Sequence, residues 1–416
     1  MSSVPTVSSG VLPKGGVLCV VGARPNYMKM APLLRAMANH VPALPTMLVH
    51  TGQHYERNMN ERFFDALQLP PPTVNLGVGS GSHASQTADI MRRFEPVLQK
   101  SRAACVAVVG DVNSTLACAL VAAKQGVPVV HVEAGLRSFD RSMPEEINRV
   151  LTDQLADRLY TTERSASANL VREGVAPERI CFAGNVMIDS VVYNLPQAKR
   201  VSETLRNCHV DPQLLNAETD ADPDYDRDHD HDRDRDRDPG YGLVTLHRPS
   251  NVDSGPALQH LVQVLCEVAR DVPLVFVVHP RTRLNLQRFG LMDLIDPKRL
   301  VLLPAQGYLE MLGLLSGAKL VLTDSGGLQE ESTALDIACL TLRDNTERPI
   351  TVEQGSNTLV GHDRERILRA VHAVLAGRGK HGQRPELWDG QAAVRIAADL
   401  YRWLHTKPVT DVEGVA

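Results

Sequence analysis

The chain has 416 residues, of which 43% are hydrophobic and 22% charged, and its formal net charge is -5. This length exceeds one typical core, so we expect two domains, and the acidic balance argues against nucleic-acid binding, which requires clustered Lys and Arg. The chain shows no secretory signal pattern and no run near the roughly 18 apolar residues of a membrane span, and its scattered cysteines suggest free thiols in a reducing cytosol.

Short apolar runs alternate with helix-length amphipathic segments from Gly16 to about Ala183, the pattern of a parallel, doubly wound α/β sheet. The strands expected there are GVLCVV, TMLVH, CVAVV, VPVVHV, RLYTT and ICFAG. A second series begins at Gly242 with GLVTL, PLVFVV, LVLL, KLVLT and ACLTL. We therefore predict two Rossmann-like domains, over residues 1–195 and 242–390, and a closing C-terminal helix and tail over 391–416.

An interdomain segment, residues 196–241, is expected between them, and its centre is of low complexity. From Asp220 to Asp238, Asp occupies every even position while Arg and His fill many odd ones. Neither alternating face is apolar, so we expect residues 220–238 to form a solvated, disordered loop. His229 and His231 could bind a metal with neighbouring aspartates, but such a repeat rarely holds a fixed coordination geometry, and no metal site is predicted.

The first strand is followed by GARPNYMK, in which Gly22 is expected to permit a tight turn into a helix. Arg24 and Lys29 supply cations, and Arg24 could form a bidentate contact with a diphosphate. A surface helix start with two exposed cations would look the same. No Walker lysine motif is present and no G-x-G-x-x-G follows the first strand, so use of ATP or NAD is not expected.

Carboxylates follow two strands of the first series. Asp111 in GDVNST ends one strand, and Glu133 ends the strand expected over Val127–Val132, at the edge where open α/β sheets bind ligands. Glu145 and Glu146 then begin a helix that has Pro144 in its first turn. A salt-bridged Glu133 and ordinary helix-start glutamates are the alternatives. Several carboxylates gathered at one sheet edge are suited to acid–base chemistry.

The second series carries corresponding signals. His247 in TLHRP ends its first strand and could carry a proton at neutral pH. In DSGGLQEE, Ser325, Gly326 and Gly327 lead into a helix whose free N–H groups would face an anion, although a simple helix cap is equally compatible with this pattern. Glu331 could accept hydrogen bonds from ribose hydroxyls, and Arg348 adds a cation. Together these residues suggest a phosphate site beside acid–base groups, as a sugar nucleotide requires.

In this order, the motifs resemble those of the non-hydrolysing UDP-N-acetylglucosamine 2-epimerases, which have the GT-B fold. The resemblance runs from about Gly22 to Gly361, through GARPNYMKMAPL, TGQHYERNM, GDVNSTLACALVA, HVEAGLRSFDRSMPEEINR, AGNVMIDS, LVTLHRPSN, TDSGGLQEE and RDNTERPITVEQGSN. It implies two Rossmann-like domains that close over a UDP-sugar in a cleft. It also implies a cytoplasmic homodimer that supplies cell-surface polysaccharide synthesis.

The resemblance implies a reaction without NAD or metal, so no cofactor is expected. The C2 proton is removed and UDP leaves C1, giving 2-acetamidoglucal, which takes UDP back with C2 inverted. The resemblance assigns the handling of protons and of the leaving group to Asp111, Glu133, Glu145 and His247. It does not decide which carboxylate removes the C2 proton. UDP-sugar contacts carried over by motif are Arg24, Lys29, Gln306, Met311, Ser325, Gly326, Gly327, Glu331 and Arg348.

The leading hypothesis is reversible C2 epimerisation of UDP-N-acetylglucosamine to UDP-N-acetylmannosamine. The alternatives are the same chemistry on UDP-2,3-diacetamido-2,3-dideoxyglucuronic acid and a hydrolysing epimerase. A GT-B glycosyltransferase or a non-catalytic UDP-sugar sensor would not need the carboxylates.

Met311 replaces an aromatic found in some members, so any uracil contact would be a looser thioether one. Gln53-His54-Tyr55-Glu56 departs from the Gln-x-x-Gln of substrate-activated members, which argues against substrate activation. Glu146, on another helical face, is expected to be structural.

Overall fold

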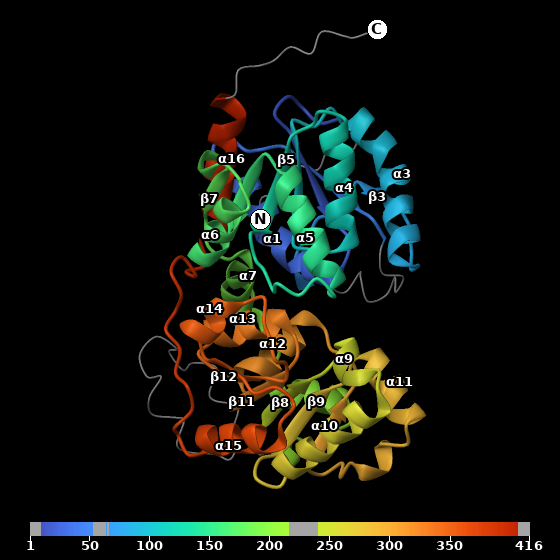
Figure 1. Cartoon of the computed structure of the whole chain (residues 1–416), viewed down its shortest axis with the longest axis vertical. Helices are drawn as coiled ribbons and strands as arrows, with labels where there is room; N and C mark the ends of the chain where they lie inside the picture. Colours follow the sequence, from blue (N-terminus) through green and yellow to red (C-terminus); the bar gives the residue numbers. More distant parts are fainter. Residues whose placement is uncertain (1–9, 53–63, 65, 216–239, 407–416) are drawn as a thin grey trace. The chain divides into compact units, whose positions relative to one another are not determined.

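The computed structural model describes residues 10–52, 64, 66–215 and 240–406 (Figure 1). It divides into unit 1, residues 1–190 with 386–416, and unit 2, residues 191–385. The Asp-rich segment 220–238 and the motif at 53–56 lie outside the described residues.

Among the described helices, none combines the length and apolar character needed to cross a lipid bilayer. The seven cysteines form no disulfide, as predicted, and four of them are buried.

Unit 1 is built on a seven-stranded parallel sheet in the order β3-β2-β1-β4-β5-β6-β7. Its central strands are continuous apolar runs because both faces are covered, as in other parallel sheets. The strands are β1 (Val17–Val21), β2 (Thr46–His50), β3 (Val74–Asn75), β4 (Cys105–Val109), β5 (Val129–Ala134), β6 (Arg158–Thr161) and β7 (Ile180–Phe182). Every strand expected in the first series is present, and the two-residue β3 was not predicted.

Helices cover both faces of this sheet (Figure 1). On one side α4 packs between α3 and α5, and elsewhere α1 packs against α16. The helices are α1 (Arg24–Asn39), α3 (His83–Ser101), α4 (Asn113–Lys124), α5 (Pro144–Leu155), α6 (Arg164–Arg172) and α16 (Ala392–Thr406). A further helix, α7 (Val186–Asn194), begins in unit 1 and ends in unit 2. The predicted C-terminal helix is therefore α16.

Side-chain contacts tie the end of the chain to unit 1. The Asp189 carboxylate accepts the N–H groups of Ala392 and Ala393 at 3.1 and 2.7 Å, which caps the start of α16. Arg158 of β6 forms two 2.8 Å hydrogen bonds with Asp399 on the same helix. The buried Trp388 donates its indole N–H to the Thr162 carbonyl at 3.1 Å. The C-terminal helix is thus an integral part of the N-terminal sheet unit.

Unit 2 contains a six-stranded parallel sheet in the order β10-β9-β8-β11-β12-β13. The strands are β8 (Gly242–Thr245), β9 (Leu274–Val277), β10 (Leu300–Leu303), β11 (Leu320–Thr323), β12 (Ala338–Thr341) and β13 (Asn357–Leu359). The helices are α8 (Val201–Asn207), α9 (Pro249–Val252), α10 (Gly255–Val268), α11 (Pro280–Arg288), α12 (Tyr308–Ser316), α13 (Gly326–Ala334), α14 (Pro349–Glu353) and α15 (Arg364–Leu375). The short β13 was not predicted.

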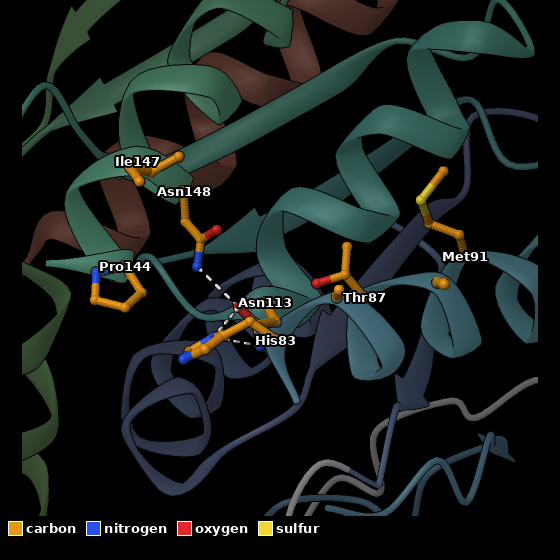
Figure 2. Close-up of a pocket in the computed structure, with 9 residues that line it drawn as sticks. His83, Thr87, Met91, Asn113, Pro144, Ile147 and Asn148 are labelled. Carbon is orange, nitrogen blue, oxygen red and sulfur yellow. Dashed lines mark hydrogen bonds between the residues drawn. The ribbon is translucent and has the colours of Figure 1, made fainter. Parts of the chain in front are cut away.

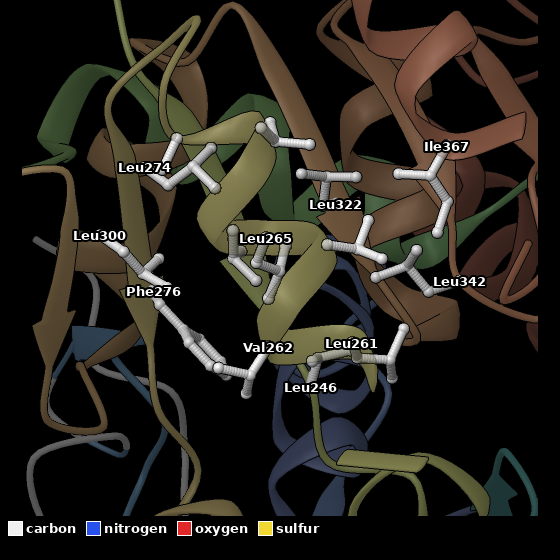
Figure 3. Packing of buried hydrophobic residues seen from close by; sticks show 14 of the residues in the cluster. Leu246, Leu261, Val262, Leu265, Leu274, Phe276, Leu300, Leu322, Leu342 and Ile367 are labelled. Atoms are coloured by element: carbon white, nitrogen blue, oxygen red, sulfur yellow. The ribbon is translucent and has the colours of Figure 1, made fainter. Parts of the chain in front are cut away.

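Alternation along the strands of unit 2 gives each face of its sheet a separate core. Leu274 and Phe276 of β9 belong to the cluster that includes α10 and α15, which Figure 3 shows. Val275 and Val277 of the same strand belong to a second cluster with side chains of α8 and α12. This period of two is the expected geometry of a strand buried on both sides.

Both sheets change direction at one point in their strand order, between β1 and β4 and between β8 and β11. Doubly wound sheets bind ligands outside the carboxyl ends of the strands at such a switch point. The segments that follow these four strands contain Arg24, Asp111, His247 and Gly326. The predicted α/β class with parallel, doubly wound sheets is confirmed, and the topology places the polar motifs at the carboxyl edge of each sheet.

Gly22 follows β1, and the reason for a glycine there is space and not the predicted turn conformation. Gly22 is not among the residues with positive φ. A Cβ atom at this position would lie 2.1 Å from Ser114 Oγ and 2.8 Å from Thr51 Oγ1. These two hydroxyls are buried and hydrogen-bonded to each other at 2.8 Å, so they cannot easily give way.

We expect Gly22→Ala to destabilise unit 1 by about 1–3 kcal/mol, the usual loss for an overpacked core. Urea unfolding of the purified protein measures this loss. Gly81→Ala is a matched control, because its Cβ would come no nearer than 3.9 Å to other atoms. Equal stability of the two variants would contradict the steric explanation.

Candidate active site

Asp111 lies just beyond β4, on a loop held from several sides. Its carbonyl accepts the Asn148 side-chain N–H at 2.9 Å, and its carboxylate accepts a short hydrogen bond from Arg149. Behind this loop, Asn26 donates to the Val109 carbonyl at 2.9 Å and accepts the N–H groups of the turn after β1. Hydrogen bonds therefore connect the ends of β1 and β4 with α5.

Glu133 is the penultimate residue of β5, one residue beyond the expected strand end. Its φ is +70°, and the pairing register with β6 shifts between Val132 and Ala134, an irregularity of the kind that a β-bulge produces. A non-glycine residue in the left-handed region is uncommon and is held only by its surroundings. Bulges re-aim side chains and are frequent beside active sites. Glu133 is therefore held in an unusual backbone conformation near the end of β5.

The carboxylate of Glu133 pairs with a cation that the sequence had suggested for phosphate. Lys29 Nζ lies 2.6 Å from Glu133 Oε1, and both side chains are almost fully buried. Gly110, with φ of +64°, allows this approach, because a Cβ there would lie 3.0 Å from the ammonium nitrogen. Lys29 therefore provides the counter-charge for a buried carboxylate in the structure.

A second buried network supports the same loops. His131 of β5 contacts Asp153 with Nδ1 at 2.6 Å and the Gly110 carbonyl with Nε2 at 2.8 Å. Asp153 also pairs with Arg137 at 2.7 Å and accepts the Gly135 N–H at 3.1 Å. This network anchors the turn before Asp111 and the turn after Glu133 to α5.

The start of α5 holds Glu145 and Glu146 in different settings. Glu145 is half-buried, whereas Glu146 is buried. The Glu146 carboxylate accepts hydrogen bonds from Ser138 and Phe139 in the loop before the helix and from Arg149 one turn later. The structure therefore places Asp111, Glu133 and Glu145 on neighbouring segments of unit 1, and it shows that Glu146 is held inside the protein.

A pocket of about 410 Å³ opens beside this network, between α3 and the start of α5. Figure 2 shows Thr87 and Met91 on one side and Pro144 and Ile147 on the other, with Asn148 directed toward Asn113. The lining contains none of the predicted site residues, but its Asn148 also holds the Asp111 carbonyl.

In unit 2, His247 follows β8 and is oriented by a residue that the sequence analysis did not single out. Asp324 Oδ1 lies 2.9 Å from His247 Nδ1, and the same carboxylate accepts the N–H groups of His247 and Arg248 at 2.9–3.1 Å. Burial acts to raise the pKa of Asp324, but His247 and these N–H groups hold it below its usual value. A carboxylate on Nδ1 fixes the ring tautomer and leaves Nε2 for proton transfer.

The glycine-rich start of α13 has the expected helix geometry. Ser325 is its N-cap residue, with φ of -84° and ψ of 127°. A Cβ on Gly326 would lie 2.6 Å from Glu347 Oε1, so the Glu347 carboxylate sits against the helix start. Burial acts to raise the pKa of Glu347, but Arg348, Arg343 and Arg248 hold it well below its ordinary value. This helix start thus carries an ionised carboxylate within a cluster of arginines.

Two of the predicted UDP contacts on this side are themselves buried. Arg348 Nε lies 2.9 Å from Glu330 Oε1. Burial, and then the charge of Glu330, raise the pKa of the neighbouring Glu331 to about 8. At neutral pH Glu331 is therefore mainly in its protonated form, which can donate as well as accept a hydrogen bond.

Glu331 should give stability a defined pH dependence. From its ordinary pKa of 4.5 up to about 8, the folded protein keeps a proton that the unfolded chain releases. The folded state then binds more protons, so stability falls as pH rises through this window. We expect urea unfolding at pH 5 to 8 to show the wild type losing stability relative to Glu331→Gln. A pH-independent difference between the two proteins would contradict the raised pKa.

The remaining predicted contacts are spread over unit 2 and the start of α1. Gln306 donates to the Pro304 carbonyl at 2.8 Å and to Cys208 Sγ at 3.3 Å. Met311 lies on α12, partly buried against the second core cluster. Arg24 is the first residue of α1, at the carboxyl end of β1.

Several residues of these networks were missed by sequence reasoning. Asp324 stood inside the TDSGG motif, and its position directly after β11 could have drawn attention to it. Asn26, Asn148 and Arg149 carry no signal of their own, because their importance depends on contacts between segments distant in sequence.

The chain is similar to several known proteins. Residues 36–401 match the family model described as UDP-N-acetylglucosamine 2-epimerase. A protein of that name from Methanocaldococcus jannaschii is 41% identical over 377 residues, covering 88% of this chain and 96% of the relative. A UDP-2,3-diacetamido-2,3-dideoxy-D-glucuronate 2-epimerase from Pseudomonas aeruginosa is 38% identical over 390 residues, covering 92% and 99%. The crystal structure of Methanocaldococcus jannaschii UDP-GlcNAc 2-epimerase in complex with UDP-GlcNAc and UDP has a TM-score of 0.80 and 38% identity, covering 93% of this chain and 99% of that chain.

Proposed function

The chain belongs to the UDP-N-acetylglucosamine 2-epimerase family, and from that premise we propose that it interconverts UDP-N-acetylglucosamine and UDP-N-acetylmannosamine. The observation that carries this proposal is the group of carboxylates in unit 1. Asp111 follows β4, Glu133 lies near the end of the adjacent β5, Glu145 lies in the first turn of α5, and Lys29 balances the charge of Glu133. A glycosyltransferase or a UDP-sugar sensor would not require such a group.

The reaction proceeds by elimination and re-addition. One carboxylate takes the proton from C2 while the C1–O bond to UDP breaks, and the electron pair of the C2–H bond forms the C1–C2 double bond of 2-acetamidoglucal. UDP then returns to C1, and a proton is delivered to the opposite face of C2. Positioned acid and base groups typically contribute about 10²- to 10⁴-fold in rate to such proton transfers.

We assign proton handling and leaving-group protonation to Asp111, Glu133, Glu145 and His247. Loss of UDP early in the reaction requires the diphosphate charge to be balanced, which cations and a helix N-terminus achieve. UDP-sugar binding is assigned to Arg24, Lys29, Gln306, Met311, Ser325, Gly326, Gly327, Glu331 and Arg348. Asp324 supports this assignment for His247, because its contact with Nδ1 leaves Nε2 facing away from the carboxylate.

A second candidate substrate is UDP-2,3-diacetamido-2,3-dideoxyglucuronic acid. It is favoured by the Pseudomonas aeruginosa relative, which is 38% identical and almost entirely covered. The same elimination chemistry would apply, because only substituents at C3 and C5 of the sugar differ.

Incubation with each UDP-sugar in D₂O, followed by NMR at C2, tests the proposal. We expect deuterium at C2 of recovered sugar nucleotide and formation of the C2 epimer with one of the two sugars. Absence of exchange with both would overturn the epimerase function, and release of free sugar would indicate the hydrolysing reaction.

We further propose a homodimer that acts in the cytoplasm, as the family resemblance implies. Sedimentation equilibrium of the purified full-length chain should give twice the mass of 45.5 kDa. A monomer mass at working concentrations would remove the dimer from the proposal and leave the reaction unaffected.

A further inference from the structure

Resting on that proposed function, we propose that Glu146 is a positioning residue for the C2 chemistry, which acts through Arg149 on the Asp111 carboxylate. The sequence suggested an ordinary helix-start residue at this position. The structure shows instead a buried carboxylate linked to a proposed catalytic group through one arginine.

Glu146 is held by four hydrogen bonds. Oε2 accepts the Ser138 N–H at 3.0 Å, the Ser138 hydroxyl at 2.9 Å and Arg149 Nη1 at 2.6 Å. Oε1 accepts the Phe139 N–H at 2.9 Å. The side chain is only 4% exposed, so water cannot replace these partners. The carboxylate therefore has one orientation, fixed at both oxygens.

Arg149 transmits that orientation to Asp111. Its guanidinium uses Nη1 for Glu146 and Nη2 for Asp111 Oδ2. Because a guanidinium is planar and rigid, fixing one nitrogen fixes the direction in which the other donates. Asp111 remains 21% exposed at its side chain, whereas Arg149 is 4% exposed. Arg149 thus holds Asp111 from the protein side and leaves part of its carboxyl group accessible.

The neighbouring residue strengthens this link. Asn148 donates to the Asp111 carbonyl at 2.9 Å, so α5 holds both the main chain and the side chain of Asp111. Two groups on successive residues of one helix then define where the carboxylate points. Of these two residues, Arg149 is the one that contacts the Asp111 carboxyl group, and Glu146 holds Arg149 in place.

Glu146 also fixes the loop that joins two of the proposed catalytic carboxylates. Phe139 lies between Glu133 and Glu145 with φ of +58°, and the residue is 72% exposed. An exposed aromatic residue in the left-handed region needs a local restraint. The hydrogen bond from its N–H to Glu146 supplies one. A single carboxylate therefore sets Asp111 and the path of this loop together.

The variant Glu146→Gln keeps the side-chain size but presents an NH₂ group to a set of donors and removes the charged partner of Arg149. Small displacements of a catalytic group cost up to about 10²-fold in rate, so we expect kcat for C2 exchange to fall about 10- to 100-fold. KM and UDP affinity should stay within about threefold, because the reacting geometry and not substrate binding is lost.

Asp399→Asn is the matched control. Asp399 also binds an arginine bidentately and accepts a hydroxyl, from Arg158 and Tyr160, in the same unit. We expect it to lower thermal stability like Glu146→Gln but to leave kcat unchanged. A double variant adds a second readout, because residues that act in series are not additive. In an Arg149→Lys background, Glu146→Gln should therefore cost much less than it does alone.

Several outcomes would overturn the proposal: unchanged kcat in Glu146→Gln, an equal loss in the control, or additive losses in the double variant. If Glu146→Gln does not fold, Ser138→Ala removes one donor from the same carboxylate and should lower kcat at constant KM. An unchanged kcat there would overturn the proposal equally. If the wild type shows no C2 exchange, both the proposed function and this role of Glu146 are wrong. If the wild type is active and none of the variants has a lower kcat, only the role of Glu146 is wrong.

Discussion

Replacing Asp111 by Asn is expected to lower kcat by about 10²- to 10⁴-fold, the range for loss of one positioned acid or base. An amide cannot take or deliver the C2 proton or protonate the leaving group. Arg149 would also lose a charged partner on that side. UDP affinity should stay within about tenfold of wild type, because an interaction used only in the transition state contributes little to ground-state binding.

Steady-state turnover and calorimetric UDP titration together test this result. Asp157→Asn is a suitable control, since Asp157 is also in unit 1 and accepts a backbone N–H from Val129 at 2.8 Å. Its kcat should remain near wild type. A large loss of UDP binding in Asp111→Asn would show that Asp111 belongs to the binding site and not to the proton chemistry.

Much of the fold could be predicted because its strands are buried on both faces. Runs such as CVAVV and LVLL contain no polar residue, which is typical of strands buried on both faces, and helix-length segments separate them. The two strands that escaped prediction are the short ones, β3 with Val74 and Asn75 and β13 at residues 357–359. Their sequences carry too few apolar positions to show a period, so pairing with a neighbouring strand decides their conformation.

The position of the candidate site could be predicted for a related reason. Parallel strands place their following loops at one edge, so Asp111 and His247 were assigned from strand ends alone. What the sequence could not provide was the pairing of side chains. Lys29 was expected to bind a diphosphate, and in the structure it contacts Glu133, which lies 104 positions away in the chain.

The same limit explains Glu146. One carboxylate after a helix-start proline looks like any other, and the helix dipole accounts for both Glu145 and Glu146. Only the folded chain shows that one is half-buried and the other receives four hydrogen bonds. Sequence patterns identify residues with suitable chemistry, but only burial and hydrogen-bond partners distinguish Glu145 from Glu146.

Breaking the buried ion pair between Lys29 and Glu133 should have the second large effect. The nitrogen–oxygen distance is 2.6 Å, and the side chains are 6% and 2% exposed. Removing one partner of a buried pair leaves a charge without its counter-charge, which typically costs about 3–5 kcal/mol of stability. We therefore expect Lys29→Met to be strongly destabilised in urea unfolding, and Glu133→Gln to be destabilised and to lose most turnover.

The double variant Lys29→Met with Glu133→Gln separates the two effects. With both charges gone, much of the lost stability should return, because replacing a buried pair by neutral side chains of similar size is often nearly neutral. Turnover should stay low, since no carboxylate is restored at the end of β5. Additive losses of stability would show that the two residues do not act as a pair.

UDP titration of Lys29→Met then decides whether this side chain also binds substrate. A weakened affinity means that the ammonium contacts the diphosphate as well, and an unchanged affinity limits Lys29 to holding Glu133.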